Sequence, residues 1–97
     1  MIIFLFGGKN CDNCHIAYQS LKFGGWTDSK KDLFVFVDIG LEQNDSICDK
    51  FSVDEIPHIV ILDKGIQVLH AIGIAALPEL LRDLKKHEDS ERLSISD

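Results

Sequence analysis

The chain has little positive charge and no long apolar segment, and each shortage argues against a class of protein. Its 97 residues carry 10 Lys and Arg against 16 Asp and Glu, a formal net charge of -6. A general nucleic-acid binder needs a basic face to displace counterions from phosphates, so neither a nucleic acid nor an anionic membrane is an expected partner. No segment approaches the roughly 18 consecutive apolar residues of a membrane-spanning helix.

The chain also lacks an even number of cysteines, and its three cysteines do not suggest a framework of structural disulfides. The apolar start, residues 1–6, lacks the basic region and the small-residue cleavage site of a secretory signal, and a buried strand explains it better. We therefore expect a cytoplasmic protein in a reducing compartment. Catalysis, metal binding and packing are then the possible roles of the cysteines.

What is present indicates one small α/β domain. Apolar runs at residues 2–6 and 33–37 are typical of strands buried on both faces, and residues 59–62 and 66–70 flank a glycine turn that predicts a β-hairpin. Helical stripes start near Cys11, with Asn10 as N-cap, and near residues 44 and 77. The order βαβαββα predicts a mixed four-stranded sheet flanked by three helices. We place this domain at residues 1–87 and a polar tail at 88–97.

The chemistry concentrates in Cys11-Asp12-Asn13-Cys14. Two residues between cysteines at a helix start bring both sulfur atoms within disulfide range, and the helix N-terminus stabilises a thiolate at the first. We expect Cys11 to be the nucleophile and Cys14 to attack the resulting mixed disulfide. Lys9 would favour the Cys11 thiolate. The carboxylate of Asp12 would oppose it, which predicts a reductant rather than a strong oxidant.

Zinc and haem are alternative uses of this cysteine spacing. A structural zinc site needs four ligands, but Cys48 and the four histidines offer no second closely spaced pair. Cys14-His15 completes the attachment pattern of c-type haem, yet that class wants an exported chain and a second axial ligand, and Met1 is the only methionine. We expect no metal and no bound cofactor, only a redox-active Cys11–Cys14 disulfide.

Four landmarks in this order resemble thioredoxin: the cysteine pair between the first strand and helix, Ile56-Pro57 before the hairpin, Lys64-Gly65 at its turn, and Gly73 after it. The resemblance covers nearly all of the predicted domain, although thioredoxin's usual N-terminal helix and strand have no counterpart. It implies the thioredoxin-like fold.

The resemblance also implies roles for three residues. Pro57 would be a cis-proline against the cysteine pair, the Ile56 backbone would pair with an extended substrate segment, and Gly73 would lie where the substrate approaches. The plainer alternatives are a trans proline at the start of an edge strand and an ordinary turn before a helix.

Two departures from thioredoxin leave potential and substrate choice open. Thioredoxin has Trp before its first cysteine and Gly-Pro between the pair, where this chain has Asn10 and Asp12-Asn13. Its buried aspartate in the preceding strand would align near Leu5. The proton acceptor for Cys14 is therefore unassigned.

The resemblance implies a small monomeric reductase of protein disulfides, such as those of ribonucleotide reductase. Its electron donor would be a thioredoxin reductase or glutathione. A glutaredoxin-like enzyme is an alternative, although glutaredoxin's Thr-Val before the proline is here Glu55-Ile56, and its Gly-Gly with following aspartates is here Gly73-Ile74. A non-catalytic binding module with the same fold is a second alternative.

Four further side chains have both a functional and a plain interpretation. Cys48 lies on the apolar side of its helix and is expected to be a small buried hydrophobe. Trp26 either forms a substrate-facing patch or closes a loop over the core. His15 and His58 either tune the Cys11 thiolate or are ordinary helix and strand histidines.

Overall fold

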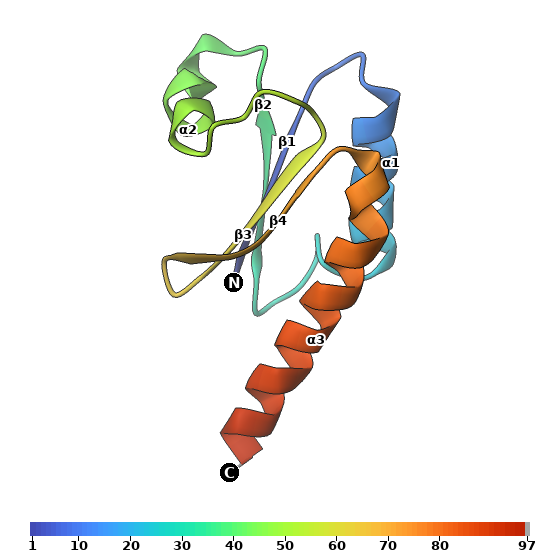
Figure 1. The fold of residues 1–97 in the computed structure, drawn as a ribbon, viewed down its shortest axis with the longest axis vertical. Coiled ribbons are helices and arrows are strands. Elements are labelled where there is room, and N and C mark those ends of the chain that lie inside the picture. Colours follow the sequence, from blue (N-terminus) through green and yellow to red (C-terminus); the bar gives the residue numbers. More distant parts are fainter. Residues whose placement is uncertain (97) are drawn as a thin grey trace.

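A four-stranded sheet with the strand order β2-β1-β3-β4 forms the centre of the molecule (Figure 1). This computed structural model describes residues 1–96, and side chains as far as residue 90. β1 pairs in parallel with β2 and antiparallel with β3, which pairs antiparallel with β4. The strands are β1 (Ile2–Gly7), β2 (Leu33–Asp38), β3 (His58–Asp63) and β4 (Ile66–Ile72). The predicted mixed sheet is confirmed.

Three α-helices flank this sheet, two on one face and one on the other (Figure 1). α1 and α3 lie side by side, whereas the short α2 lies on the opposite face. The helices are α1 (Asp12–Phe23), α2 (Asp45–Lys50) and α3 (Leu77–Ser96), and the 3-10 turns η1 (Glu42–Asn44) and η2 (Ile74–Ala76) precede the last two. Across the described chain, no helix has the length and apolar character needed to cross a membrane.

The last helix extends further than its apolar stripe predicts. The backbone of residues 88–96 continues α3, in the segment where the sequence predicted a polar tail. Lys85 forms ion pairs with Glu88 at 3.7 Å and with Asp89 at 3.9 Å, one helical turn away. Pairs at these spacings each stabilise an exposed helix by a few tenths of a kcal/mol, about 0.2–0.5. A polar sequence can therefore remain helical beyond the core.

Each face of the sheet carries its own core because successive side chains of a strand point to opposite faces. On the α1 and α3 side, Ile3 and Leu5 pack with Ala17 and Leu21. Trp26 belongs to this core and is only 8% exposed, so it closes a loop over the core rather than forming an exposed patch. The core on the α2 side is built on Phe6, Val37 and Val60.

The register of β1 and β3 determines where a site can form. Phe6, near the end of β1, pairs with His58, the first residue of β3. Because the two strands run in opposite directions, the segment that follows β1 and the segment that precedes β3 lie at the same end of the sheet. The first contains Cys11 and the second contains Pro57.

Candidate redox site

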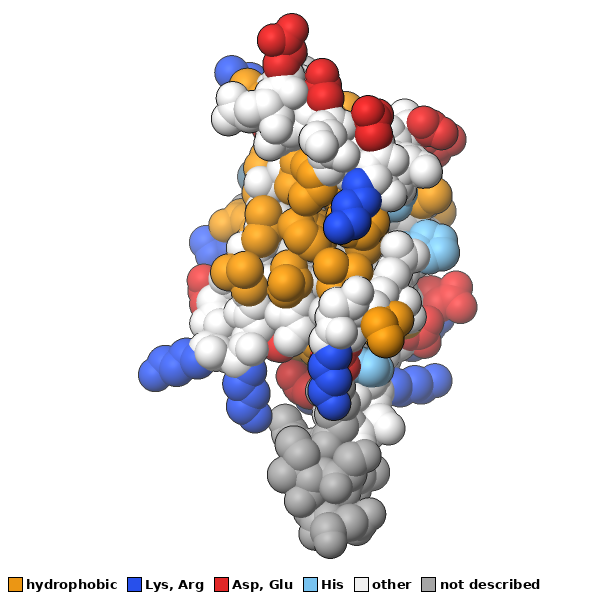
Figure 2. Space-filling model, turned by 90° about the vertical axis from the view of Figure 1, so that its left-hand side faces the viewer, with side chains coloured by type: hydrophobic (Ala, Val, Ile, Leu, Met, Phe, Trp, Pro, Cys, Tyr) orange, Lys and Arg blue, Asp and Glu red, His pale blue; other side chains and the backbone are white. Residues whose placement is uncertain are grey.

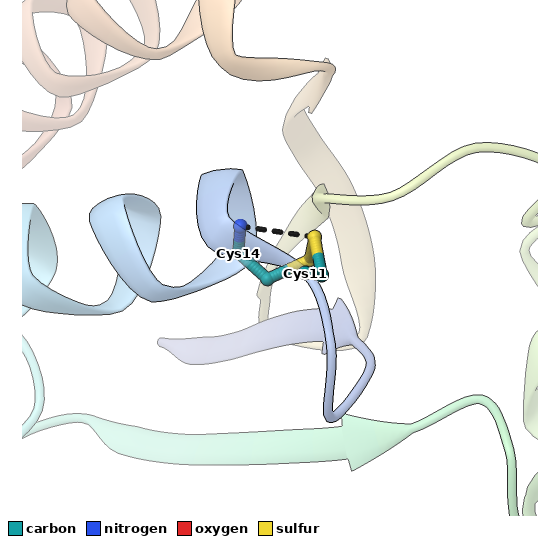
Figure 3. The surroundings of a disulfide bond; sticks show 2 residues. All are labelled: Cys11 and Cys14. Atoms are coloured by element: carbon teal, nitrogen blue, oxygen red, sulfur yellow. Dashed lines mark hydrogen bonds between the residues drawn. A yellow bond between two sulfur atoms is a disulfide. The ribbon is translucent and has the colours of Figure 1, made fainter.

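Cys11 and Cys14 are joined by a disulfide at the start of α1 (Figure 3). Their Cα atoms are 5.2 Å apart. Cys11, rather than the expected Asn10, is the N-cap residue, because its sulfur accepts a hydrogen bond of 3.1 Å from the backbone N–H of Cys14. That N–H belongs to the first turn of the helix, where backbone donors have no partner within the helix.

The two sulfurs differ in their access to solvent. Cys11 is partly exposed, whereas Cys14 is 3% exposed and faces the sheet. When the disulfide is reduced, the positive end of the helix dipole and the N–H of Cys14 favour a thiolate at Cys11. The accessible sulfur is thus the one that the helix activates, which is the arrangement needed for thiol-disulfide exchange.

A hollow of about 270 Å³ contains both cysteines. Its lining comes from the cysteine loop, from α1 and from β2, and consists of Gly8, Lys9, Cys11, Cys14, His15, Tyr18 and Phe36. Lys9 is therefore beside the pair, as the sequence suggested, and Asp12 is the acidic residue in the first turn of α1. Tyr18 and Phe36 were missed, since their place in the hollow depends on how α1 packs against β2.

Gly7 lies in close contact with the disulfide. A Cβ at this position would lie 3.2 Å from Sγ of Cys14 and 3.0 Å from the ring of Phe36. Contacts this short are tighter than normal packing, so only glycine fits without a shift of its neighbours. In the sequence Gly7 directly follows the apolar run of residues 2–6, and its contact with the disulfide depends on the position of α1.

The segment before β3 meets the cysteine loop from the other side. The Ile56–Pro57 peptide bond is cis, as the resemblance implies, and Pro57 is fully buried. The carbonyl oxygen of Pro57 accepts a 2.8 Å hydrogen bond from the N–H of Gly73, whose φ of +85° requires a glycine. The structure thus brings Pro57 and Gly73 together.

Ile56 itself lines a second hollow, of about 300 Å³, on the far side of the cysteine loop. Gly8 and Lys9 are shared between this hollow and the one that contains the cysteines. Ile39 and Leu41, from the loop after β2, add exposed apolar side chains to its lining. The cysteine loop is therefore flanked by two hollows, and three aliphatic side chains line the second one together with polar residues.

The histidines occupy different positions relative to the pair. His15 is exposed and lines the hollow that contains both cysteines. His58 is buried on the α2 side of the sheet, with its ring 5.8 Å from that of Phe6 and its Nδ1 without a hydrogen-bond partner. Burial lowers the pKa of His58, and His70 lowers it further. The ring of His58 therefore does not lie beside Cys11.

Two other side chains complete the surroundings. Leu5 is fully buried in the α1 and α3 core, so an aliphatic side chain stands where thioredoxin's aspartate would align. Cys48 is partly buried against the core on the α2 side, which favours its interpretation as a packing residue. Burial raises the pKa of the Cys48 thiol, and the carboxylates of Asp45 and Asp49 raise it further.

No cluster that could hold a metal ion, with three or more His, Cys, Asp or Glu, occurs in the part of the chain that the structure describes.

Comparisons with known proteins give matches in structure only. No protein-family model and no curated protein matches the sequence. Thioredoxin 1 from the thermophilic eubacterium Thermosipho africanus superposes with a TM-score of 0.78 at 16% identity, over 95% of this chain and 99% of that one. Thioredoxin-2 of the malaria parasite gives 0.73 at 23% identity, over 89% and 82% of the two chains.

The thioredoxin of Fasciola hepatica is similar to the same degree, with a TM-score of 0.72 at 23% identity over 89% of this chain and 79% of that one. At these identities the likeness concerns the fold. Together with the strand order and the disulfide between the first strand and the first helix, it shows that the chain has the thioredoxin fold predicted from its sequence.

Proposed function

We propose that this chain is a thiol-disulfide oxidoreductase that reduces protein disulfides through Cys11 and Cys14. The observation that carries the proposal is the disulfide at the N-terminus of α1, in which an accessible sulfur accepts a backbone hydrogen bond and its partner is buried. Perturbed, accessible thiols at helix starts are the reactive ones, whereas thiols buried in apolar surroundings are inert.

The exchange takes place in two displacement steps. In the reduced protein, the Cys11 thiolate attacks one sulfur of the substrate disulfide, and the other substrate sulfur leaves as a thiolate that takes up a proton. Cys14 then loses its proton and attacks Sγ of Cys11. This breaks the mixed disulfide, releases the second substrate thiol and forms the Cys11–Cys14 disulfide. The substrate gains two electrons and two protons.

The same proposal gives roles to the residues around the pair. The Ile56 backbone pairs with an extended substrate segment, Pro57 bounds the site beside the cysteine loop, and Gly73 leaves room for the approaching chain. Their support is their position, since Ile56 and the cysteine loop line one hollow and Gly73 is hydrogen-bonded to Pro57. Lys9 favours the Cys11 thiolate and Asp12 opposes it.

The cellular setting completes the proposal. We place the protein in the cytoplasm, with disulfides such as that of ribonucleotide reductase as substrates. A thioredoxin reductase or glutathione returns the electrons. No metal or bound cofactor takes part, because the electrons are carried by the cysteine pair itself.

A disulfide-reduction assay on insulin tests the proposal, with dithiothreitol as electron donor. Wild type is expected to accelerate reduction, whereas Cys11→Ser should leave the rate of dithiothreitol alone. Cys48→Ser is the matched control and should retain the wild-type rate, because Cys48 lies against the opposite face of the sheet. Equal activity of wild type and Cys11→Ser would overturn the proposal and favour a non-catalytic binding module.

A trapping experiment tests the order of the two cysteines. Cys14→Ser should accumulate a mixed disulfide between Cys11 and a substrate thiol, since the second displacement has lost its nucleophile. Cys11→Ser should not accumulate the corresponding adduct on the buried Cys14. Mass spectrometry of both variants after incubation with an oxidised peptide distinguishes them.

A change of electron donor in the insulin assay tests the source of the electrons. Dithiothreitol is replaced either by NADPH with thioredoxin reductase or by NADPH with glutathione and its reductase, and the combination that supports reduction identifies the donor.

A further inference from the structure

The α2 side of the sheet is covered only in part (Figure 2). α2 has six residues and lies at one end of this face, so apolar side chains remain visible below it. The open face, as we call this surface, consists of Ile2, Phe4, Leu33, Val35 and Leu62. Leu33 is 58% exposed, and the other four side chains are partly buried.

The register of the strands makes the open face one continuous surface. Leu33 pairs with Ile2, and Ile2 pairs with Leu62, so these three side chains form a row across three strands. Phe4 and Val35 form the next row. Large contiguous apolar patches on a protein surface mark interaction sites.

Charges of opposite sign lie at the two ends of the open face. The end at which β2 begins carries the exposed Lys30 and Lys31, and Lys64 follows β3 at the same end. The other end, where η1 and α2 follow β2, carries the exposed acidic side chains Glu42, Asp45 and Asp49. In Figure 2, red side chains lie above the apolar patch and most blue ones below it, although one blue side chain lies against the upper part of the patch and red ones also lie at its lower edge.

Three other charged groups near the ends of the open face have partners in the structure. At the lysine end, Asp32 is ion-paired with the amino group of Met1 at 3.0 Å, and Asp63 is hydrogen-bonded to Nε2 of His87 at 2.8 Å. At the acidic end, the ammonium group of Lys50 lies over the ring of Phe51, 5.7 Å from its centroid. The net pattern is a basic end, an apolar centre and an acidic end.

We infer that the open face is the interface of a homodimer. An isologous interface uses the same patch on both copies, so the patch must be complementary to itself. Two sheets can face each other about a two-fold axis that lies in the interface and runs either along the strands or across them. The axis across the strands places the acidic end of each copy over the basic end of the other, and the charges therefore select it.

This dimer leaves the cysteine pair accessible, because α1 lies against the opposite face of the sheet (Figure 1). The inference does not depend on the proposed redox activity. It differs from the sequence-based expectation of a monomer, because the sequence alone does not show which strand face a short helix leaves uncovered. Apolar burial between two sheets supplies the attraction, and the two charged junctions determine the orientation.

Sedimentation equilibrium of the full oxidised chain tests the inference. The mass of wild type should rise from monomer to dimer with concentration. Leu33→Glu, at an exposed position, should weaken the dimer at least tenfold. Phe23→Glu is the matched control, because Phe23 is 97% exposed at the end of α1 on the other side and should leave the dissociation constant unchanged. A cooperative thermal transition in both variants shows that they are folded.

A charge exchange tests the orientation. Lys30→Glu with Lys31→Glu makes both ends acidic, and Glu42→Lys with Asp49→Lys makes both ends basic. Each double variant alone should be monomeric at concentrations where wild type is dimeric, and an equal mixture should regain the dimer mass. Wild type that remains monomeric up to a protein concentration of about 1 mM would overturn the inference. A dimer insensitive to Leu33→Glu, or a mixture that remains monomeric, would overturn it as well.

Discussion

Gly7 lies directly against Cys14, and no side chain separates the end of β1 from the disulfide. A Cβ on Gly7 would be 3.2 Å from both Cβ and Sγ of Cys14. β1 is hydrogen-bonded on both edges, to β2 and β3, so its backbone can shift little to relieve such a contact. The cysteine pair is therefore seated on the backbone of an interior strand.

Gly7→Ala should lower the free energy of unfolding of the oxidised protein by about 1–3 kcal/mol, the usual cost of overpacking a well-packed site. Gly8→Ala is the matched control. A Cβ there would meet only the terminal Cδ1 of Ile56, at 3.3 Å, which can move at little cost. Urea unfolding of both variants measures the difference. Equal losses of stability would show that the contact with Cys14 does not limit the packing.

His58 should make the fold less stable at mildly acidic pH. Its pKa in the folded chain lies below the ordinary 6.5, because burial and then His70 disfavour the charged ring. As the pH falls below about 6.5, the unfolded chain binds a proton that the folded chain resists, and stability is lost. Wild type should therefore lose more stability than His58→Leu between pH 7.5 and 5.5.

His15→Asn is the control for this pH effect, because it removes an exposed histidine from α1 and should keep the wild-type slope. Urea unfolding at a series of pH values gives the slopes of all three proteins. Parallel curves for wild type and His58→Leu would mean that burial does not restrain the protonation of His58.

Cys48 should react slowly with alkylating agents in the oxidised protein, where Cys11 and Cys14 are joined and it is the free cysteine. Burial, and then Asp45 and Asp49, raise its pKa above the ordinary 9.0, which lowers the thiolate fraction at neutral pH. Iodoacetamide should therefore modify Cys48 more slowly in the folded chain than in urea.

Asp45→Asn combined with Asp49→Asn should recover only part of this difference in rate, because burial is the larger cause. Mass spectrometry of the modified chain gives the rates. A folded rate equal to the unfolded one would contradict the prediction.

The sequence predicted those features that depend on neighbouring residues. Continuous apolar runs gave the strands, the turn at Gly65 gave the hairpin, and the spacing of Cys11 and Cys14 gave the disulfide. Gly65 has a φ of +80°, so a purely local requirement determined that turn. The thioredoxin resemblance added the cis bond before Pro57.

Features that depend on packing between distant segments could not be predicted from the sequence. Phe36 and Tyr18 line the cysteine hollow only because the fold brings β2 and α1 to the same hollow, and nothing in their local sequence indicates it. Trp26 had two interpretations of similar weight until the core showed where it packs. The face toward which His58 points depended on the pairing register with Phe6.

The two halves of the redox site are attached to the two interior strands. Cys11 follows the end of β1 and Pro57 precedes the start of β3, and both strands are paired on both edges, whereas β2 and β4 are each paired on one. Amides in such doubly paired strands exchange with solvent mainly through global opening, and edge strands open locally at lower free energy. Local opening of β2 and β4 would therefore leave Cys11 and Pro57 aligned until the molecule unfolds as a whole, and deuterium uptake should begin at these edge strands.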